Sequence, residues 1–240
     1  KPGKQGEVAV VMRGGRGTGK GTFANWFGRL FGQHYMYLTN AKHLVGNFNA
    51  HLRDAVVVFA DEAFFAGDKS HASVLKGMIT DPFITIEAKY KNAVTARNII
   101  HLLMASNEDW VVPAGQDERR FCVIELCSAV KQNHKYFEAI NKQMENGGLA
   151  AMLYDLQHHD LTGFNVRAVP TTSALVDQKI RSLSGPEAWL YDSLQRGEIR
   201  HHLWTSAGLA VPKSIAYEDY KDRHKDFRDY APVGISSWAK

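Results

Sequence analysis

A glycine-rich run at residues 14–22, Gly-Gly-Arg-Gly-Thr-Gly-Lys-Gly-Thr, constrains the fold of this chain more than any other segment. An apolar run at residues 8–12 precedes it and predicts a buried strand, and residues 23–31 after it have the apolar spacing of a helix. A strand, a glycine loop ending in Gly-Lys, and a helix form the layout of a phosphate-binding P-loop. The glycines let successive backbone N–H groups point into one concavity at the positive end of the helix. The segment therefore predicts a nucleoside triphosphate site rather than a surface turn.

Within this loop, Lys20 is expected to contact the β- and γ-phosphates of ATP. The other residues assigned to the phosphate cradle are Gly14, Gly15, Arg16, Gly17, Thr18, Gly19, Gly21 and Thr22. The position after the lysine normally carries a Ser or Thr that holds Mg²⁺, but here it is Gly21 and the hydroxyl follows at Thr22. Gly-Lys-Gly-Thr also occurs in adenylate kinases, so the loop alone leaves ATP hydrolysis and phosphate transfer both open.

Two adjacent acids, Asp61 and Glu62, follow the apolar residues 55–60. This pattern predicts a second buried strand whose carboxyl end carries both carboxylates, and ligands bind at that edge of an open parallel sheet. Asp61 would hold Mg²⁺, and Glu62 would orient and deprotonate the attacking water. The alternative is a helix cap made of Asp with a first-turn Glu. Because a kinase has no use for a hydrolytic base, the pair favours hydrolysis.

Further along the chain, the apolar run 98–106 ends at Asn107, and Arg119 and Arg120 precede a predicted strand at residues 121–126. A carboxamide beside the γ-phosphate can bind both the phosphate and the lytic water. Either arginine could complete the ATP site of a neighbouring subunit as an arginine finger, and the sequence does not say which. The alternatives are a simple strand exit at Asn107 and a solvated pair of charges.

Taken in this order and spacing, these motifs resemble the AAA+-like ATPases of superfamily 3 helicases. Within that group the chain looks like the ATPase of phage and plasmid primase-helicases, related to the poxvirus type. Four further segments carry the resemblance, at residues 75–91, 164–172, 177–179 and 189–190. It implies a ring, expected to be a hexamer, that translocates on single-stranded DNA, and a primase-polymerase domain covalently linked to the ATPase.

Residues 84–96 predict a hairpin, because Ile84, Ile86 and Val94 alternate around the tip residues Lys89, Tyr90 and Lys91. Lysines bind backbone phosphates without reading sequence, and a tyrosine can stack on a base. The alternative is a solvated hairpin whose lysines confer only solubility. The resemblance favours contact with single-stranded DNA, since hairpins at this place project into the pore of superfamily 3 rings.

The composition of 240 residues, 45% of them hydrophobic, allows one large domain or two. We expect an α/β P-loop NTPase core of AAA+ type with a parallel sheet at residues 1–157, and a mostly helical lobe at 158–240 that could be winged-helix-like. With a net charge of +4, DNA contact must be a local patch. The sequence contains no signal peptide and no apolar run of about eighteen residues, so a cytoplasmic protein is expected, in the host cell if phage-encoded.

The sequence thus predicts an Mg²⁺-dependent ATP hydrolase, with the metal held by Thr22 and Asp61, that drives DNA unwinding in phage or plasmid replication. One alternative is a DNA-stimulated ATPase that remodels or loads other components without unwinding. A more distant alternative is a nucleoside monophosphate kinase, for which the sequence offers no arginine-rich lid.

Overall fold

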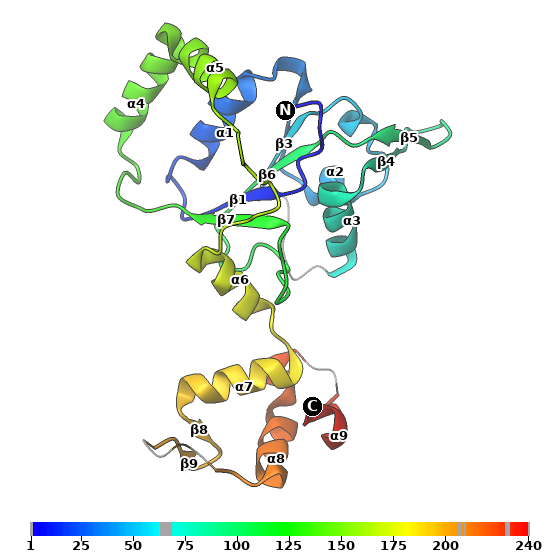
Figure 1. Ribbon diagram of the computed structural model, residues 1–240, viewed down its shortest axis with the longest axis vertical. Helices are drawn as coiled ribbons and strands as arrows, with labels where there is room; N and C mark the ends of the chain where they lie inside the picture. The colour runs from blue at the N-terminus through cyan, green and yellow to red at the C-terminus, as the bar shows by residue number, and fades with distance from the viewer. Residues whose placement is uncertain (1, 63–68, 206–207, 209, 229–230, 240) are drawn as a thin grey trace. The chain divides into compact units, whose positions relative to one another are not determined.

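The computed structural model describes residues 2–62, 69–205, 208, 210–228 and 231–239 (Figure 1). The chain forms two compact units, Lys1–Lys179 and Ile180–Lys240. The first unit extends past residue 157, where we expected the core to end, because Ala174 and Leu175 on helix α6 (Ser173–Ser182) are buried in its hydrophobic core.

The first unit is built on a parallel sheet of five strands in the order β2-β3-β6-β1-β7. Their bounds are β1 (Ala9–Arg13), β2 (Tyr35–Leu38), β3 (Val57–Asp61), β6 (His101–Ser106) and β7 (Phe121–Glu125). The prediction of an α/β fold around a parallel sheet is confirmed. Because β3, β6 and β1 are neighbours and point the same way, the loops that follow these three strands meet at one edge of the sheet.

Both faces of this sheet are covered, which explains why its strands are apolar along their whole length. Successive residues of a strand point to opposite faces, so Val58 and Ala60 join one hydrophobic cluster while Val57 and Phe59 join the other. The first cluster is completed by side chains of α2, α3 and α6, and the second by side chains of α1. The covering helices are α1 (Lys20–Arg29), α2 (Ala41–Val45) and α3 (Lys69–Thr80).

Helix α1 approaches strand β2 closely at Gly28. A Cβ atom at this position would lie 2.5 Å from the Tyr35 ring, a separation too short for any side chain. Tyr35 is partly buried against the cluster that contains Ala24 of the same helix. Gly28 is therefore required by the packing of helix on sheet, although glycine inside a helix carries a backbone entropy cost.

The first unit also contains the predicted hairpin and a pair of helices. The hairpin consists of β4 (Phe83–Ile86) and β5 (Val94–Arg97), paired antiparallel. The helical region after β7 consists of α4 (His134–Gln143) and α5 (Leu149–His158), joined by a π-helical turn (Met144–Gly148). The chain kinks inside that turn, where Gly147 adopts φ 95°.

The second unit is mostly helical, with a small hairpin. Its elements are α7 (Gly185–Arg196), β8 (Glu198–Ile199), β9 (His202–Leu203), α8 (Lys213–Arg223) and α9 (Ile235–Trp238). Its core gathers Trp189, Ile199, Ala216, Tyr220 and Phe227, and the Trp189 indole donates to Asp219 Oδ2 at 2.7 Å. The strands of its hairpin have two residues each, and a winged-helix assignment stays a prediction. Among the described residues of the chain, no helix combines the length and the hydropathy needed to cross a bilayer.

Candidate functional site

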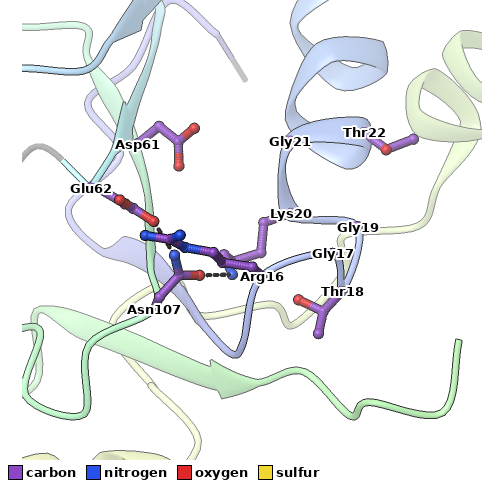
Figure 2. A pocket seen from close by; sticks show the side chains of 10 residues that line it. All are labelled: Arg16, Gly17, Thr18, Gly19, Lys20, Gly21, Thr22, Asp61, Glu62 and Asn107. Carbon is purple, nitrogen blue, oxygen red and sulfur yellow. Dashed lines mark hydrogen bonds between the residues drawn. The ribbon is translucent and has the colours of Figure 1, made fainter. Parts of the chain in front are cut away.

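A pocket of about 380 Å³ lies at the carboxyl ends of the central strands. It draws residues from the loop between β1 and α1, from the end of β3 and from the residue after β6 (Figure 2). The residues lining it are Arg16, Gly17, Thr18, Gly19, Lys20, Gly21, Thr22, Asp61, Glu62 and Asn107. Three segments that the sequence assigned to a single site are therefore brought together.

The glycine loop, residues 14–22, is shaped by two glycines that other residues could not easily replace. Gly17 and Gly19 adopt φ values of 78° and 96°, in the left-handed region that favours glycine. Gly19 forms the N-cap of α1, so the N–H groups of the first helical turn are free of capping side chains. A loop that ends at an uncapped helix N-terminus can bind an anion through these N–H groups.

Lys20 is buried at the centre of the pocket. Its Nζ donates to the carbonyl oxygens of Gly14 and Gly15, at 3.0 Å for Gly15, and to Asn107 Oδ1 at 2.7 Å. These three bonds use all the hydrogens of an ammonium group. Burial lowers the pKa of Lys20, while the nearby carboxylates of Asp61 and Glu62 act in the opposite direction.

Asn107 connects Lys20 to Glu62. Its Oδ1 accepts from Lys20 and its Nδ2 donates to Glu62 Oε1, as the dashed lines of Figure 2 show. The backbone of Glu62 holds φ at 53°, which non-glycine residues rarely adopt, and its N–H donates to Ala105 O at 2.8 Å. The ammonium, the carboxamide and the carboxylate form one continuous hydrogen-bonded chain, which we call the Lys20–Asn107–Glu62 chain.

Asp61 has a hydrogen-bond partner that the sequence did not predict. The hydroxyl of Tyr37, on the neighbouring strand β2, donates to Asp61 Oδ2 at 2.5 Å. This hydrogen bond, followed by partial burial and the charge of Asp61, raises the pKa of Tyr37 to about 12. Tyr37 is therefore a neutral donor at physiological pH, and it holds one oxygen of Asp61 in place.

The structure does not bring together the two predicted Mg²⁺ ligands. Thr22 lines the pocket, but in Figure 2 its side chain points away from Asp61, on the other side of the first turn of α1. Across the described ranges, no group of three or more His, Cys, Asp or Glu side chains is arranged to hold a metal ion. Mg²⁺ commonly binds one or two carboxylates together with the phosphates of a nucleotide, and Asp61 at the mouth of the pocket fits that role.

The two arginines before β7 differ in environment. Arg120 is held by the buried carboxylate of Glu118, with Nη1 at 3.4 Å from Oε1. Glu118 also accepts the backbone N–H of both arginines and lies 3.5 Å from Lys76 Nζ. Arg119 is exposed and has no ion pair in the described part of the chain. Neither arginine lines the pocket of its own chain.

The predicted basic hairpin tip is present and projects from the first unit (Figure 1). Tyr90 is 92% exposed and adopts φ 64°, and the turn is closed by Lys91 N donating to Ala88 O at 3.1 Å. The Lys89 ammonium lies 5.1 Å from the centre of the Tyr90 ring. Tyr90 therefore lies exposed between Lys89 and Lys91 and does not pack in the core.

The segment Asp177-Gln-Lys, which the sequence singled out only through the resemblance, holds α6 against the first unit. Asp177 pairs with Arg13 at the end of β1. Gln178 is fully buried; its Oε1 accepts from Val111 N at 2.7 Å, and its Nε2 donates to Asp109 O at 2.7 Å. These contacts are structural and explain why α6 belongs to the first unit.

Comparison with known proteins finds one matching family and one phage relative. Residues 12–120 match a family described as "Family of unknown function (DUF5906)". A DNA primase-polymerase of Nitratiruptor phage NrS-1 is 30% identical over 128 residues, which are 52% of this chain and 18% of that protein.

Two structures of the NrS-1 C-terminal region in the apo state share the fold. One has a TM-score of 0.63 at 23% identity and covers 82% of this chain and 51% of the other. The second has a TM-score of 0.61 at 22% identity and covers 80% and 50%. This chain therefore spans about half of those structures and less than a fifth of the phage protein.

Proposed function

We propose that this chain is an ATP-hydrolysing motor domain that acts on single-stranded DNA during phage replication. The observation that carries the proposal is the Lys20–Asn107–Glu62 chain. A glycine-loop lysine, a carboxamide and a carboxylate, which follow three neighbouring strands, line one pocket. Hydrolysis of a phosphoanhydride requires a cation that binds the phosphates and a base that deprotonates water. Here a carboxamide, which can bind both the phosphate and the water, links the two groups.

In the proposed reaction, the β- and γ-phosphates lie in the glycine loop, and Lys20 exchanges its bonds to the Gly14 and Gly15 carbonyls for phosphate oxygens. Asn107 then binds the γ-phosphate and the attacking water. Glu62, released from Asn107, accepts the proton of that water. Asp61, oriented by Tyr37, would hold Mg²⁺, which would offset charge on the phosphates when bound.

Assembly into a ring, proposed as a hexamer, would place an arginine of one subunit at the ATP site of the next. The structure favours Arg119 for this role, because Arg120 is occupied by Glu118 whereas Arg119 is exposed. An arginine finger must be free to reach a phosphate in another subunit. The ring would belong to the AAA+-like superfamily 3 type and use Lys89, Tyr90 and Lys91 to contact DNA in its pore.

The replication context is inferred from the relative. The NrS-1 protein is named a primase-polymerase, and the part that resembles this chain is a small fraction of its length. We therefore propose that this ATPase works together with a primase-polymerase domain, whether in the same polypeptide or in a partner. The resemblance to poxvirus primase-helicases stays a prediction.

Two variants test the chemistry. Lys20→Ala removes a cation from the phosphates, so it should weaken nucleotide binding and abolish turnover. Glu62→Gln retains an oxygen that can accept from Asn107 but is no base, so it should bind ATP normally and hydrolyse it at least about 10²-fold more slowly. Phosphate release and nucleotide titration would be measured with and without single-stranded DNA. Normal turnover by Glu62→Gln would refute the assignment of the base.

A strand-displacement assay separates the motor from the alternative that loads or remodels without unwinding. A motor should displace a labelled strand in the presence of ATP, and the Glu62→Gln protein should not. DNA-stimulated hydrolysis without displacement, on substrates with either a 3′ or a 5′ single-stranded tail, would favour the loading alternative.

A further inference from the structure

A second pocket, of about 520 Å³, lies along one side of helix α4 and has no part in the chemistry proposed above. Its lining residues recur every three or four positions and so form one stripe of the helix: His134, Phe137, Glu138, Asn141, Lys142 and Glu145. We call this the α4 pocket. Its lining combines the partly buried ring of Phe137 with exposed side chains that can form hydrogen bonds.

The α4 pocket adjoins the glycine loop. A Cβ atom on Gly19 would lie 2.9 Å from Cε1 of Phe137, so the ring of Phe137 rests directly on the loop. Just before the helix, the backbone N–H of Gln132 donates to Gly17 O at 3.3 Å. Phe137 therefore belongs to both sites: it lines the α4 pocket and packs against a residue that lines the phosphate pocket.

The direction of a bound nucleotide follows from the positions of these groups. Its γ-phosphate must lie near Glu62 and Asn107, which hold the attacking water in the proposed reaction. Figure 2 shows Glu62 and Asp61 on one side of Lys20, and Gly17 and Gly19 on the other. The nucleoside end of the molecule must leave on the side of Gly17 and Gly19. That is the side on which Phe137 and the α4 pocket lie.

The polar groups of the pocket match the edge of a nucleobase. The Trp26 indole N–H donates to Asn141 Oδ1 at 2.8 Å. Because an indole nitrogen only donates, the amide oxygen must face it, and Nδ2 of Asn141 is left as a donor. Glu138, one helical turn before Asn141, supplies an acceptor. A donor and an acceptor beside an aromatic ring can bind a base that offers a ring nitrogen or carbonyl next to an N–H group.

We propose that the α4 pocket binds the base of the nucleotide whose phosphates occupy the glycine loop, with Phe137 against the base and Asn141 and Glu138 at its polar edge. The inference rests on the proposed function, since it requires a nucleotide in the glycine loop. It assigns the choice among nucleoside triphosphates to α4, a helix more than a hundred residues after the glycine loop.

The test compares binding of ATP with binding of inorganic triphosphate, which has no base. Asn141→Asp keeps an acceptor for Trp26 while removing the donor, and Glu138→Ala removes the acceptor. Each should weaken ATP roughly five- to tenfold, as the loss of one hydrogen bond predicts, and leave triphosphate within about twofold. Gln143→Ala, an exposed polar residue of the same helix outside the pocket, is the matched control and should change neither.

Titrations with GTP and CTP on the same proteins identify the base that the pocket prefers. Unchanged ATP affinity in both pocket variants would overturn the inference and leave the proposed function standing. Equal losses of ATP and triphosphate would overturn it too, because α4 would then only support the glycine loop. A wild-type protein that binds neither ligand would refute the proposed function itself.

Discussion

Tyr37→Phe offers a sensitive test of the proposed metal site, because it removes a single hydroxyl. That hydroxyl donates to Asp61 Oδ2 at 2.5 Å. A hydrogen bond to a charged group contributes about 1.5–3 kcal/mol. Tyr37 is 50% exposed, so water can replace part of the bond, and about 1 kcal/mol is a reasonable net value. This corresponds to a roughly fivefold rise in the Mg²⁺ concentration needed for half-maximal hydrolysis, with little change in the rate at saturating Mg²⁺.

The same strand supplies the control. The hydroxyl of Tyr35 is buried and has no hydrogen-bond partner among the described residues, so Tyr35→Phe removes no hydrogen bond. It should leave the Mg²⁺ titration unchanged. Both variants keep the aromatic ring, and any difference between them reports on the bond to Asp61.

The pH dependence of this effect has a definite sign. The pKa of Tyr37 is raised to about 12, so its hydroxyl is protonated and its bond to Asp61 is fully present below the ordinary tyrosine pKa of about 10. The contribution of this bond is lost only as the pH rises through 12. The wild-type and Tyr37→Phe titrations should therefore differ by the same factor from neutral pH up to about 10. An unchanged titration, or an equal shift in Tyr35→Phe, would refute a positioning role for Tyr37.

Three further predictions concern packing, assembly and DNA. Gly28→Ala places a methyl group against a tyrosine ring and should destabilise the fold by about 1–3 kcal/mol, measured by urea unfolding. Arg119→Ala and Lys20→Ala proteins, each inactive alone, should regain part of their hydrolysis when mixed. Some interfaces then join an intact Arg119 of one subunit to an intact Lys20 of the next. If mixed assemblies recover no activity, Arg119 does not act across the interface. Joint replacement of Lys89 and Lys91 by Ala should weaken single-stranded DNA binding and flatten its salt dependence. If the wild-type and variant proteins give identical DNA titrations at several salt concentrations, the two lysines confer only solubility.

The central fold could be predicted from the sequence because its strands are buried on both faces. Continuous apolar runs such as residues 98–106 mark strands of this kind, and the polar residues that end them mark the edge where a site forms. Lys20, Glu62 and Asn107 could be assigned to one site for this reason. The sequence does not show that their side chains are linked in the order Lys20, Asn107, Glu62, because that depends on side-chain positions.

The features that escaped prediction all depend on pairing between distant segments. Tyr37 reaches Asp61 only because β2 lies parallel to β3 with Tyr37 opposite Phe59, a register that alternating apolar residues do not define. Phe137 meets Gly19 across more than a hundred residues of chain. The packing of α6 on the first unit was not predicted, because its sequence is that of one more helix in a helical region; its buried Gln178 shows where it packs.

The Lys20–Asn107–Glu62 chain has a consequence for the interval between product release and the next substrate. A buried ammonium without partners would destabilise the fold, yet Lys20 has three acceptors within its own chain. Under the proposed function, these bonds would satisfy Lys20 between product release and the arrival of the next phosphate, so the glycine loop would not have to unfold locally. Because Asn107 also binds Glu62, the base would become available to water only after an incoming γ-phosphate has taken the carboxamide.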